Sequence, residues 1–303
     1  MRILSVVSCL LLVVSLVGCG ERTESASYYY SPSWTRGGSI IFIYGLNSVR
    51  KDALGTQLGS SYTETVSTAE PTATAAVNTL FDATDATPYS MSTSPVGDYV
   101  AYLNNLDGST QLFSKIVIRN IAAGAHTGLD IMELAFSPGI KSFDWSNSGQ
   151  KLVYCTSTQV RTVNLSGTME DVAVISDSNI EFVAWKYGNR IAYVRTSGSD
   201  KILTLVNSDG TGKTPLAASA SVDKPQISSQ NTSEVYGIAG GAYCKVNIDA
   251  GTPATAEVLA GFKGDLPRLS PNADKVIYGK TGESSGIYLI DLTVTPTAET
   301  KIK

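Results

Sequence analysis

The sequence predicts an all-β chain folded as a six-bladed β-propeller whose blades are four-stranded antiparallel sheets. Three observations support this prediction. A phrase of strand, polar turn and strand occurs six times, successive copies are separated by about one blade's length, and a further strand candidate follows most copies. A period of about 40 to 50 residues built only of strands is typical of a propeller blade. We therefore expect one domain in which six repeats close into a ring.

Each copy of the phrase has a short strand ending in a bulky or branched residue, a turn rich in Ser, Pro, Asn, Gly or Asp, and a second apolar strand. The copies begin at Ser31, Ser90, Ser142, Glu181, Lys224 and Leu266. Their first strands end at Trp34, Thr93, Trp145, Trp185, Ile227 and Leu269. Successive ends lie 59, 52, 40, 42 and 42 residues apart. We predict that these six end residues define the repeat and its core, because large side chains on one blade fill the gap to the next.

Several of these segments resemble the TolB-like, or WD40-like, propeller repeat. That repeat reads Pro-x-Trp-Ser-Pro-Asp-Gly before an apolar strand, and Trp145-Ser146 and Leu269-Ser270-Pro271-Asn272 are similar to it. The turn at Asp209-Gly210 and the strand Ile287-Tyr288-Leu289-Ile290-Asp291 are similar to the family's closing segments. The resemblance covers nearly all of residues 30 to 300, although no copy has the complete motif. It implies the same propeller fold.

The first residues predict export and lipidation. Met1-Arg2 is followed by an uncharged apolar run from Ile3 to Val17, which is typical of a secretory signal peptide and short for a membrane span. Leu16-Val17-Gly18-Cys19 resembles a bacterial lipobox, whose cysteine becomes the lipid-carrying N-terminus. We expect a lipoprotein signal peptide over 1–18, a lipidated Cys19 with a short tether over 19–30, and the propeller over 31–303.

An ordinary signal peptide with an incidental cysteine is the alternative. Acyl chains contribute about 0.8 kcal/mol per buried methylene, so several chains on Cys19 would hold the protein on a membrane. The resemblance places the protein on the bacterial cell envelope. The residue after Cys19 is Gly20 rather than Asp, which in the similar sorting pattern points to the periplasmic side of the outer membrane if the host has two membranes.

The charge composition excludes nucleic acid as a partner. The formal net charge is −4, and it becomes −5 when residues 1–18 are removed with Arg2. Lysines and arginines are dispersed, so no basic surface for nucleic acid is expected.

Of the cysteines outside the first nineteen residues, Cys155 and Cys244 each lie in an apparent strand. An exported pair could oxidise, but we expect buried free thiols.

Two short motifs resemble catalytic or phosphate-binding signatures. Gly282-Glu283-Ser284-Ser285-Gly286 fits the G-x-S-x-G pattern of a hydrolase, but a strand follows it and the only histidine, His126, precedes it. Gly210-Thr211-Gly212-Lys213-Thr214 resembles the end of a P-loop, but Pro215 follows where a helix should begin. We interpret both as turns between strands, and we predict no catalytic residue and no cofactor.

Metal ligands are scarce in this chain. Some sugar-acid lyases resemble this propeller family but hold a metal ion with several histidines, and His126 alone cannot do so. The turns at 104–108 and 207–210 could offer oxygen ligands to calcium, but neither has the acidic residues of a dedicated calcium loop. We therefore predict no metal site.

Two segments have more than one interpretation. Residues 55–88 are rich in Thr, Ala and Ser and would hold the outer strands of the first blade with either a functional loop or a solvated one. Tyr28-Tyr29-Tyr30 would be an extra strand joining the first blade to the last, or a sticky segment near the lipid. Most other tyrosines alternate within strands, which indicates packing between blades.

The main functional hypothesis is a lipid-anchored envelope propeller acting as a non-catalytic binding or protein-interaction module, with an envelope protein or glycan as partner. Propellers bind ligands where the loops of all blades converge, at one face or the central channel. The alternative is a polysaccharide hydrolase or lyase that uses carboxylates at strand ends, such as Asp144, Glu181 and Asp223. A third hypothesis has the propeller docking an envelope protein by an edge strand or groove.

Overall fold

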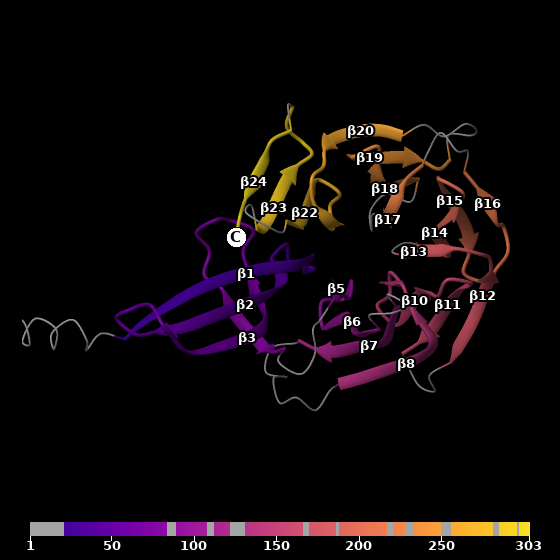
Figure 1. Cartoon of the computed structure of the whole chain (residues 1–303). Coiled ribbons are helices and arrows are strands. Elements are labelled where there is room, and N and C mark those ends of the chain that lie inside the picture. Colours follow the sequence, from indigo (N-terminus) through magenta and orange to yellow (C-terminus); the bar gives the residue numbers. More distant parts are fainter. Residues whose placement is uncertain are drawn as a thin grey trace, which may run out of the picture.

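The fold is a ring of six sheets, as the repeat predicts (Figure 1). The computed structural model describes residues 21–83, 89–107, 112–121, 131–165, 170–185, 188–216, 221–227, 233–249, 256–280, 285–295 and 297–303. Every regular element in these ranges is a β-strand, and each sheet contains four consecutive antiparallel strands. The all-β class and the six-bladed propeller are therefore confirmed. No helix in the described ranges is long and apolar enough to cross a membrane.

The strands of each blade follow one another from the centre of the ring outward. Blades one and two contain β1 (Arg22–Trp34), β2 (Ile40–Lys51), β3 (Gln57–Ala69), β4 (Asn78–Asp82), β5 (Tyr89–Thr93), β6 (Tyr99–Asp107), β7 (Leu112–Asn120) and β8 (Ile131–Ile140). Blades three and four contain β9 (Ser142–Trp145), β10 (Lys151–Cys155), β11 (Gln159–Asn164), β12 (Asp171–Ser176), β13 (Ile180–Ala184), β14 (Arg190–Ser197), β15 (Asp200–Asn207) and β16 (Thr214–Pro215). Blades five and six contain β17 (Asp223–Ile227), β18 (Glu234–Ala239), β19 (Ala242–Asn247), β20 (Ala256–Gly261), β21 (Asp265–Leu269), β22 (Lys275–Lys280), β23 (Gly286–Asp291) and β24 (Glu299–Lys301).

The apolar core is divided into six clusters, one between each pair of neighbouring blades. Because a blade is covered on both faces, its second strand is apolar on both faces. In β6, Val100, Ala101, Tyr102 and Leu103 are all buried. Equivalent tyrosines of other blades, such as Tyr154, are also buried. The expectation that most tyrosines pack between blades is therefore confirmed.

The ring closes by packing and hydrogen bonding between blades one and six. Each of these blades is completed by its own four strands, so no strand is shared. Phe42 of blade one and Ile277 and Ile287 of blade six belong to one buried cluster. The ammonium of Lys303 donates to the carbonyl oxygen of Ala75, which ties the end of blade six to blade one.

Blade one extends beyond the ring as a three-stranded ribbon formed by β1, β2 and β3 (Figure 1). The register runs from Arg22 opposite Lys51 down to Trp34 opposite Ile40. Side chains from Arg22 to Tyr28 are exposed, whereas the last residues of β1 are buried. Ordered strand therefore replaces most of the tether expected over 19–30. The Thr-rich stretch over 55–88 supplies β3 and β4, as expected for outer strands of blade one.

The inner strands of four blades bend where they reach the channel. Their ladders shift register at a non-glycine residue with positive φ, namely Ser31 (49°), Ser90 (53°), Lys224 (49°) and Leu266 (46°). Such a backbone is strained for these residue types and needs support. In blades five and six, the carboxylates of Asp223 and Asp265 each accept a hydrogen bond of 2.9 Å from the next backbone N–H. These bends place side chains of the inner strands around the opening of the channel.

Candidate functional site

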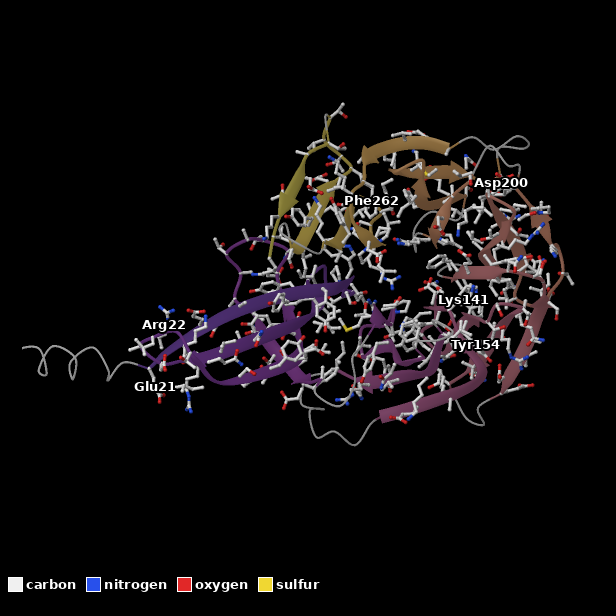
Figure 2. All side chains as sticks on the ribbon, viewed as in Figure 1. Glu21, Arg22, Lys141, Tyr154, Asp200 and Phe262 are labelled. Carbon is white, nitrogen blue, oxygen red and sulfur yellow. The ribbon has the colours of Figure 1, made fainter. Side chains whose placement is uncertain are left out.

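The inner strands enclose a central channel with an opening at each end. The opening where these strands begin, which we name the upper mouth, is a hollow of about 430 Å³. It is lined by Ser90, Phe113, Lys141, Ser142, Glu181, Phe182, Val183, Lys224, Pro225, Gln226, Asp265, Leu266, Pro267 and Arg268. Figure 2 labels Lys141 on the channel side of the ring, beside the inner strands. Five of the six blades therefore contribute to this mouth.

The opposite opening, the lower mouth, lies where the inner strands end and turn into the second strands. It is also a hollow of about 430 Å³. Its lining includes Trp34, Arg36, Thr93 and Val96. Among the described residues, Arg268 alone lines both mouths, so its side chain stands between them. Ligands that enter from the upper mouth would meet Arg268 at the bottom.

Hydrogen bonds between neighbouring inner strands form a collar around the channel. On one side of the ring, the indole N–H of Trp145 donates to the carbonyl oxygen of Ser92 at 3.0 Å. The indole N–H of Trp34 donates to the carbonyl oxygen of Arg268 at 2.9 Å, and the hydroxyl of Thr93 donates to the carbonyl oxygen of Trp34. These bonds join blade three to two, blade one to six and blade two to one.

Two polar side chains complete most of the collar on the other side. The buried carboxylate of Asp144 accepts from the backbone N–H of Trp185 at 2.9 Å, which joins blades three and four. The amide of Gln226 accepts from the backbone N–H of Leu269 at 2.5 Å and donates to the carbonyl oxygen of Pro267, which joins blades five and six. The channel wall is therefore a fixed scaffold on which the mouth residues are mounted.

The residues predicted to define the repeat lie at the collar. They are Trp34, Thr93, Trp145, Trp185, Ile227 and Leu269, and each is buried at the end of its inner strand or directly after it. Asp144 and Gln226 were not singled out as collar residues from the sequence. A polar residue one position before a buried strand end is the signal that would have pointed to them.

Both carboxylates that line the upper mouth already have a cationic partner. Glu181 forms an ion pair with Lys201 and accepts from the Thr196 hydroxyl at 2.8 Å. Burial alone would raise the pKa of Glu181, but hydrogen bonds from Lys201 and Thr196 outweigh it and hold the pKa below its usual range. Asp265 forms an ion pair with Lys224. The protein itself therefore supplies a cationic partner to each of these carboxylates.

Two cations that line the upper mouth have no such partner. Within the described ranges, the ammonium of Lys141 has neither a hydrogen bond nor an ion pair, and its charge acts on Glu181 only from beyond ion-pair distance. The guanidinium of Arg268 donates one hydrogen bond, of 3.0 Å, to the hydroxyl of Ser90. Burial lowers the pKa of Arg268, and the more distant carboxylate of Asp144 partly offsets that effect. Arg268 is therefore a half-buried cation with most of its donors unused.

A third hollow lies outside the channel, between the ribbon of blade one and blade six. It measures about 680 Å³, and Tyr28, Tyr29, Tyr30 and Tyr62 are among its lining residues. The hydroxyls of Tyr30 and Tyr62 both donate to the buried carboxylate of Glu64. Burial and this carboxylate raise the pKa of Tyr62 to about 12. The tyrosine triple is therefore part of β1, which pairs with β2 of its own blade, and does not form an extra strand between blades one and six.

The carboxylates proposed for polysaccharide chemistry are not gathered in one place. Glu181 and Asp223 both lie near Lys201, whose ammonium is 3.9 Å from Asp223. Asp144 is buried in the collar and does not line the upper mouth. In the described ranges, no group of three or more His, Cys, Asp or Glu side chains could hold a metal ion.

Both motifs that resemble enzyme signatures are followed by strands. Residues 282–284 of the G-x-S-x-G segment lie outside the described ranges, and Gly286 begins strand β23 rather than a helix. The segment at 210–214 leads into the short strand β16. His126 and Cys19 also lie outside the described ranges.

The two cysteines in apparent strands are free and buried. Burial raises the pKa of the Cys155 thiol to about 12 and that of Cys244 to about 11. The expectation of buried free thiols is confirmed, and neither thiol is available as a nucleophile at neutral pH.

No family model and no curated protein sequence matches this chain. Its fold is similar to a chain in the crystal structure of a nidogen/laminin complex, with a TM-score of 0.58 and 10% identity over 92% of this chain and 94% of that one. An oligogalacturonate lyase in complex with manganese has a TM-score of 0.52 and 11% identity over 90% and 77% of the two chains. TolB from Acinetobacter baumannii has a TM-score of 0.50 and 11% identity over 93% and 69%.

These likenesses show the fold alone. The structural likeness to TolB agrees with the resemblance that the repeat shows in the sequence. Because a lyase shares the same architecture, the fold leaves open whether this chain is an enzyme. Evidence for the function therefore comes from the residues that line the upper mouth.

Proposed function

We propose that this protein is a lipid-anchored propeller of the bacterial cell envelope that binds a partner protein at its upper mouth without catalysing a reaction. The observation that carries this proposal is the state of the mouth's carboxylates. Glu181 and Asp265 are both engaged in ion pairs with lysines of the protein. A rigid, partly apolar hollow with a few fixed polar groups is what a binding site requires.

The polysaccharide hydrolase or lyase is the less favoured function. A glycosidase needs one carboxylic acid with a raised pKa to protonate the leaving group and a second carboxylate across the scissile bond. The pKa of Glu181 is held below its usual range, because its hydrogen bonds outweigh its burial. Glu181 is therefore poorly suited to donate a proton at neutral pH, and Asp144 is committed to the collar.

The proposed lipid on Cys19 gives the ribbon a role. Figure 2 places Glu21 and Arg22 at the tip of the ribbon, away from the ring. The exposed part of β1, from Arg22 to Tyr28, is roughly 20 Å long at about 3.3 Å per residue. A lipid on Cys19 would therefore anchor the tip and hold the ring off the membrane surface. In a host with two membranes, we place the anchor on the periplasmic side of the outer membrane.

The anchor is tested by intact mass of the protein extracted from membranes of its host or a related bacterium. We expect a chain that begins at Cys19 with added acyl groups, and a Cys19→Ala variant that lacks this mass. An unlipidated chain cleaved at another residue would overturn the anchor.

Binding at the upper mouth is tested by capture of a stoichiometric partner from detergent extracts of the envelope. A Phe182→Glu variant alters the wall of the upper mouth, and Val96→Glu is the matched control at the lower mouth. Loss of a central apolar contact should weaken capture at least about tenfold in the first variant only. Both variants must keep the circular dichroism of the wild type. Equal capture by both variants would overturn the assignment of the site.

A further inference from the structure

We propose that the upper mouth captures the C-terminal carboxylate of a peptide chain, with Arg268 and Lys141 as the groups that bind it. This inference rests on the proposed binding function and specifies the chemistry of its partner. It is carried by the charges that the protein leaves unmatched, the shape of the channel and the apolar character of its wall.

The charges of the mouth leave a place for one anion. Its lining carries the cations of Lys141, Lys224 and Arg268 and the carboxylates of Glu181 and Asp265. Asp265 is paired with Lys224, and Glu181 is paired with a lysine outside the lining. Lys141 and Arg268 therefore remain without an ion pair within the described residues. A carboxylate suits this pair, because a guanidinium offers two parallel N–H donors to its oxygens.

Other groups facing Arg268 do not neutralise it. Asp144 acts on Arg268 only from beyond ion-pair distance, and its carboxylate accepts from the backbone N–H of Trp185. The hydroxyl of Ser90 accepts one hydrogen bond from Arg268 and carries no charge. A half-buried cation interacts more strongly with an incoming anion than an exposed one, because less water screens the charges.

The position of Arg268 favours a ligand that enters end-on. Arg268 lines both mouths and therefore lies at the bottom of the upper one. A group that reaches it must be at the tip of the ligand. A chain terminus has a carboxylate at its tip, whereas acidic side chains within a chain would have to bring two flanking segments into the same hollow.

The wall of the upper mouth matches a short apolar peptide end. Phe113, Phe182, Val183, Leu266 and Pro267 line the upper mouth around its polar groups. The hollow of about 430 Å³ is within the size range of small-ligand pockets. The last residue of a peptide could place its side chain against these apolar groups while its carboxylate contacts Arg268 and Lys141.

The test uses the mature full-length chain and a fluorescent tetrapeptide, dansyl-Gly-Ala-Ala-Leu, prepared both as the free acid and as the C-terminal amide. Binding is measured by fluorescence anisotropy up to about 1 mM protein, the weakest affinity of interest. We expect saturable binding of the acid and at least about tenfold weaker binding of the amide, the loss expected when a charged hydrogen-bond partner is removed. Arg268→Gln and Lys141→Gln should each weaken binding of the acid by a similar factor.

The matched control is Arg36→Gln, which removes an arginine from the lower mouth and should leave binding of the acid unchanged. Thermal melting of each variant checks that it is folded, and Lys141→Gln serves if Arg268→Gln does not fold. Acetate is tested as a competitor to separate a peptide end from a simple anion. Displacement of the peptide by acetate at concentrations similar to the peptide's own Kd would overturn the proposal.

Equal affinity for acid and amide, or the absence of saturable binding, would also overturn it. These failures are distinguishable from failure of the proposed function. If envelope capture still depends on Phe182 but the peptide end is not recognised, the mouth binds a partner by other chemistry. If capture does not depend on Phe182 either, the proposed binding function of the upper mouth is overturned as well.

Discussion

Replacing Trp145 by Phe tests whether the collar joins the blades. The Trp145 indole is fully buried, and its N–H donates to the carbonyl oxygen of Ser92 in the neighbouring blade. Phenylalanine keeps an aromatic ring in the same core but cannot donate this bond. Trp185→Phe is the matched control, because the Trp185 indole donates at 3.1 Å to Gly188 in the exposed turn of its own blade.

The expected loss in free energy of unfolding has two sources, the smaller buried ring and the carbonyl left without a donor. The smaller ring loses about 1–2 kcal/mol of burial at about 0.8 kcal/mol per methylene equivalent. Leaving the Ser92 carbonyl buried without its donor costs about 1–3 kcal/mol more. Trp145→Phe should therefore lower the free energy of unfolding by about 2–5 kcal/mol. Trp185→Phe should lose only about 1–2 kcal/mol, because water can replace the donor to Gly188.

The assay is guanidinium unfolding followed by far-UV circular dichroism, which does not depend on tryptophan emission. The wild type and both variants are compared at one protein concentration, and slopes are checked for equality before midpoints are converted to free energies. Equal destabilisation by the two substitutions would refute the argument that an inter-blade hydrogen bond is stronger support than one within a turn.

Three further predictions concern other parts of the ring. Gly237→Ala should destabilise the fold by more than about 1 kcal/mol, because a Cβ would lie 2.5 Å from a carbonyl oxygen of β17, whereas Gly261→Ala has nothing within 4 Å and should be nearly neutral in thermal melting. Cys155 and Cys244 should resist a thiol reagent at pH 8 and react only in denaturant, since burial raises both thiol pKa values; rapid labelling of native protein would contradict this. Burial would raise the pKa of Asp177, but hydrogen bonds from a lysine, a backbone N–H and a tyrosine outweigh burial and lower the pKa. Ionised Asp177 therefore stabilises the folded protein above about pH 4, and this stabilisation is lost as the pH falls through the pKa of Asp177 in the folded state. Asp177→Asn should therefore be destabilising at pH 7, and its difference from the wild type should shrink as the pH falls below about 4 and Asp177 becomes protonated; a difference that stays constant with pH would show that charge is not the cause.

The ring could be predicted from the sequence because the strands and turns of each repeat are specified by neighbouring residues. A strand, a polar turn and a second apolar strand form within one short segment, and repetition of that segment fixes the architecture. Trp34, Trp145 and Trp185 marked the strand ends for the same reason, since a large apolar residue at a fixed place in the repeat must pack between blades.

The collar and the mouth could not be predicted in the same way, because their partners are distant in the chain. Trp34 reaches Arg268 in the last blade, and Gln226 bonds to the blade that follows its own. Whether Lys141 or Lys224 has an ion-pair partner depends on how neighbouring blades are placed. Sequence spacing gives the blade to which each residue belongs but not which side chains face one another across the channel.

The outward extension of β1 was missed for a different physical reason. Residues 22–28 are polar enough to suggest a tether, whereas outer strands were expected within residues 55–88. Residues 22–28 are ordered as a strand because they pair with β2 from Lys51 to Gly45, and β3 pairs with the other edge of β2. Thr and Tyr favour strands when a partner strand is present, so pairing decides what composition leaves open.

The central claim is that a partner occupies the upper mouth of the anchored propeller. The most direct measurement is photo-crosslinking in cells with benzoylphenylalanine at Phe182, compared with the same group at Val96 of the lower mouth. We expect a discrete adduct from position 182 that disappears when Arg268 is changed to Gln, and none from position 96. Adducts of equal yield from both positions, or none from position 182, would contradict the account.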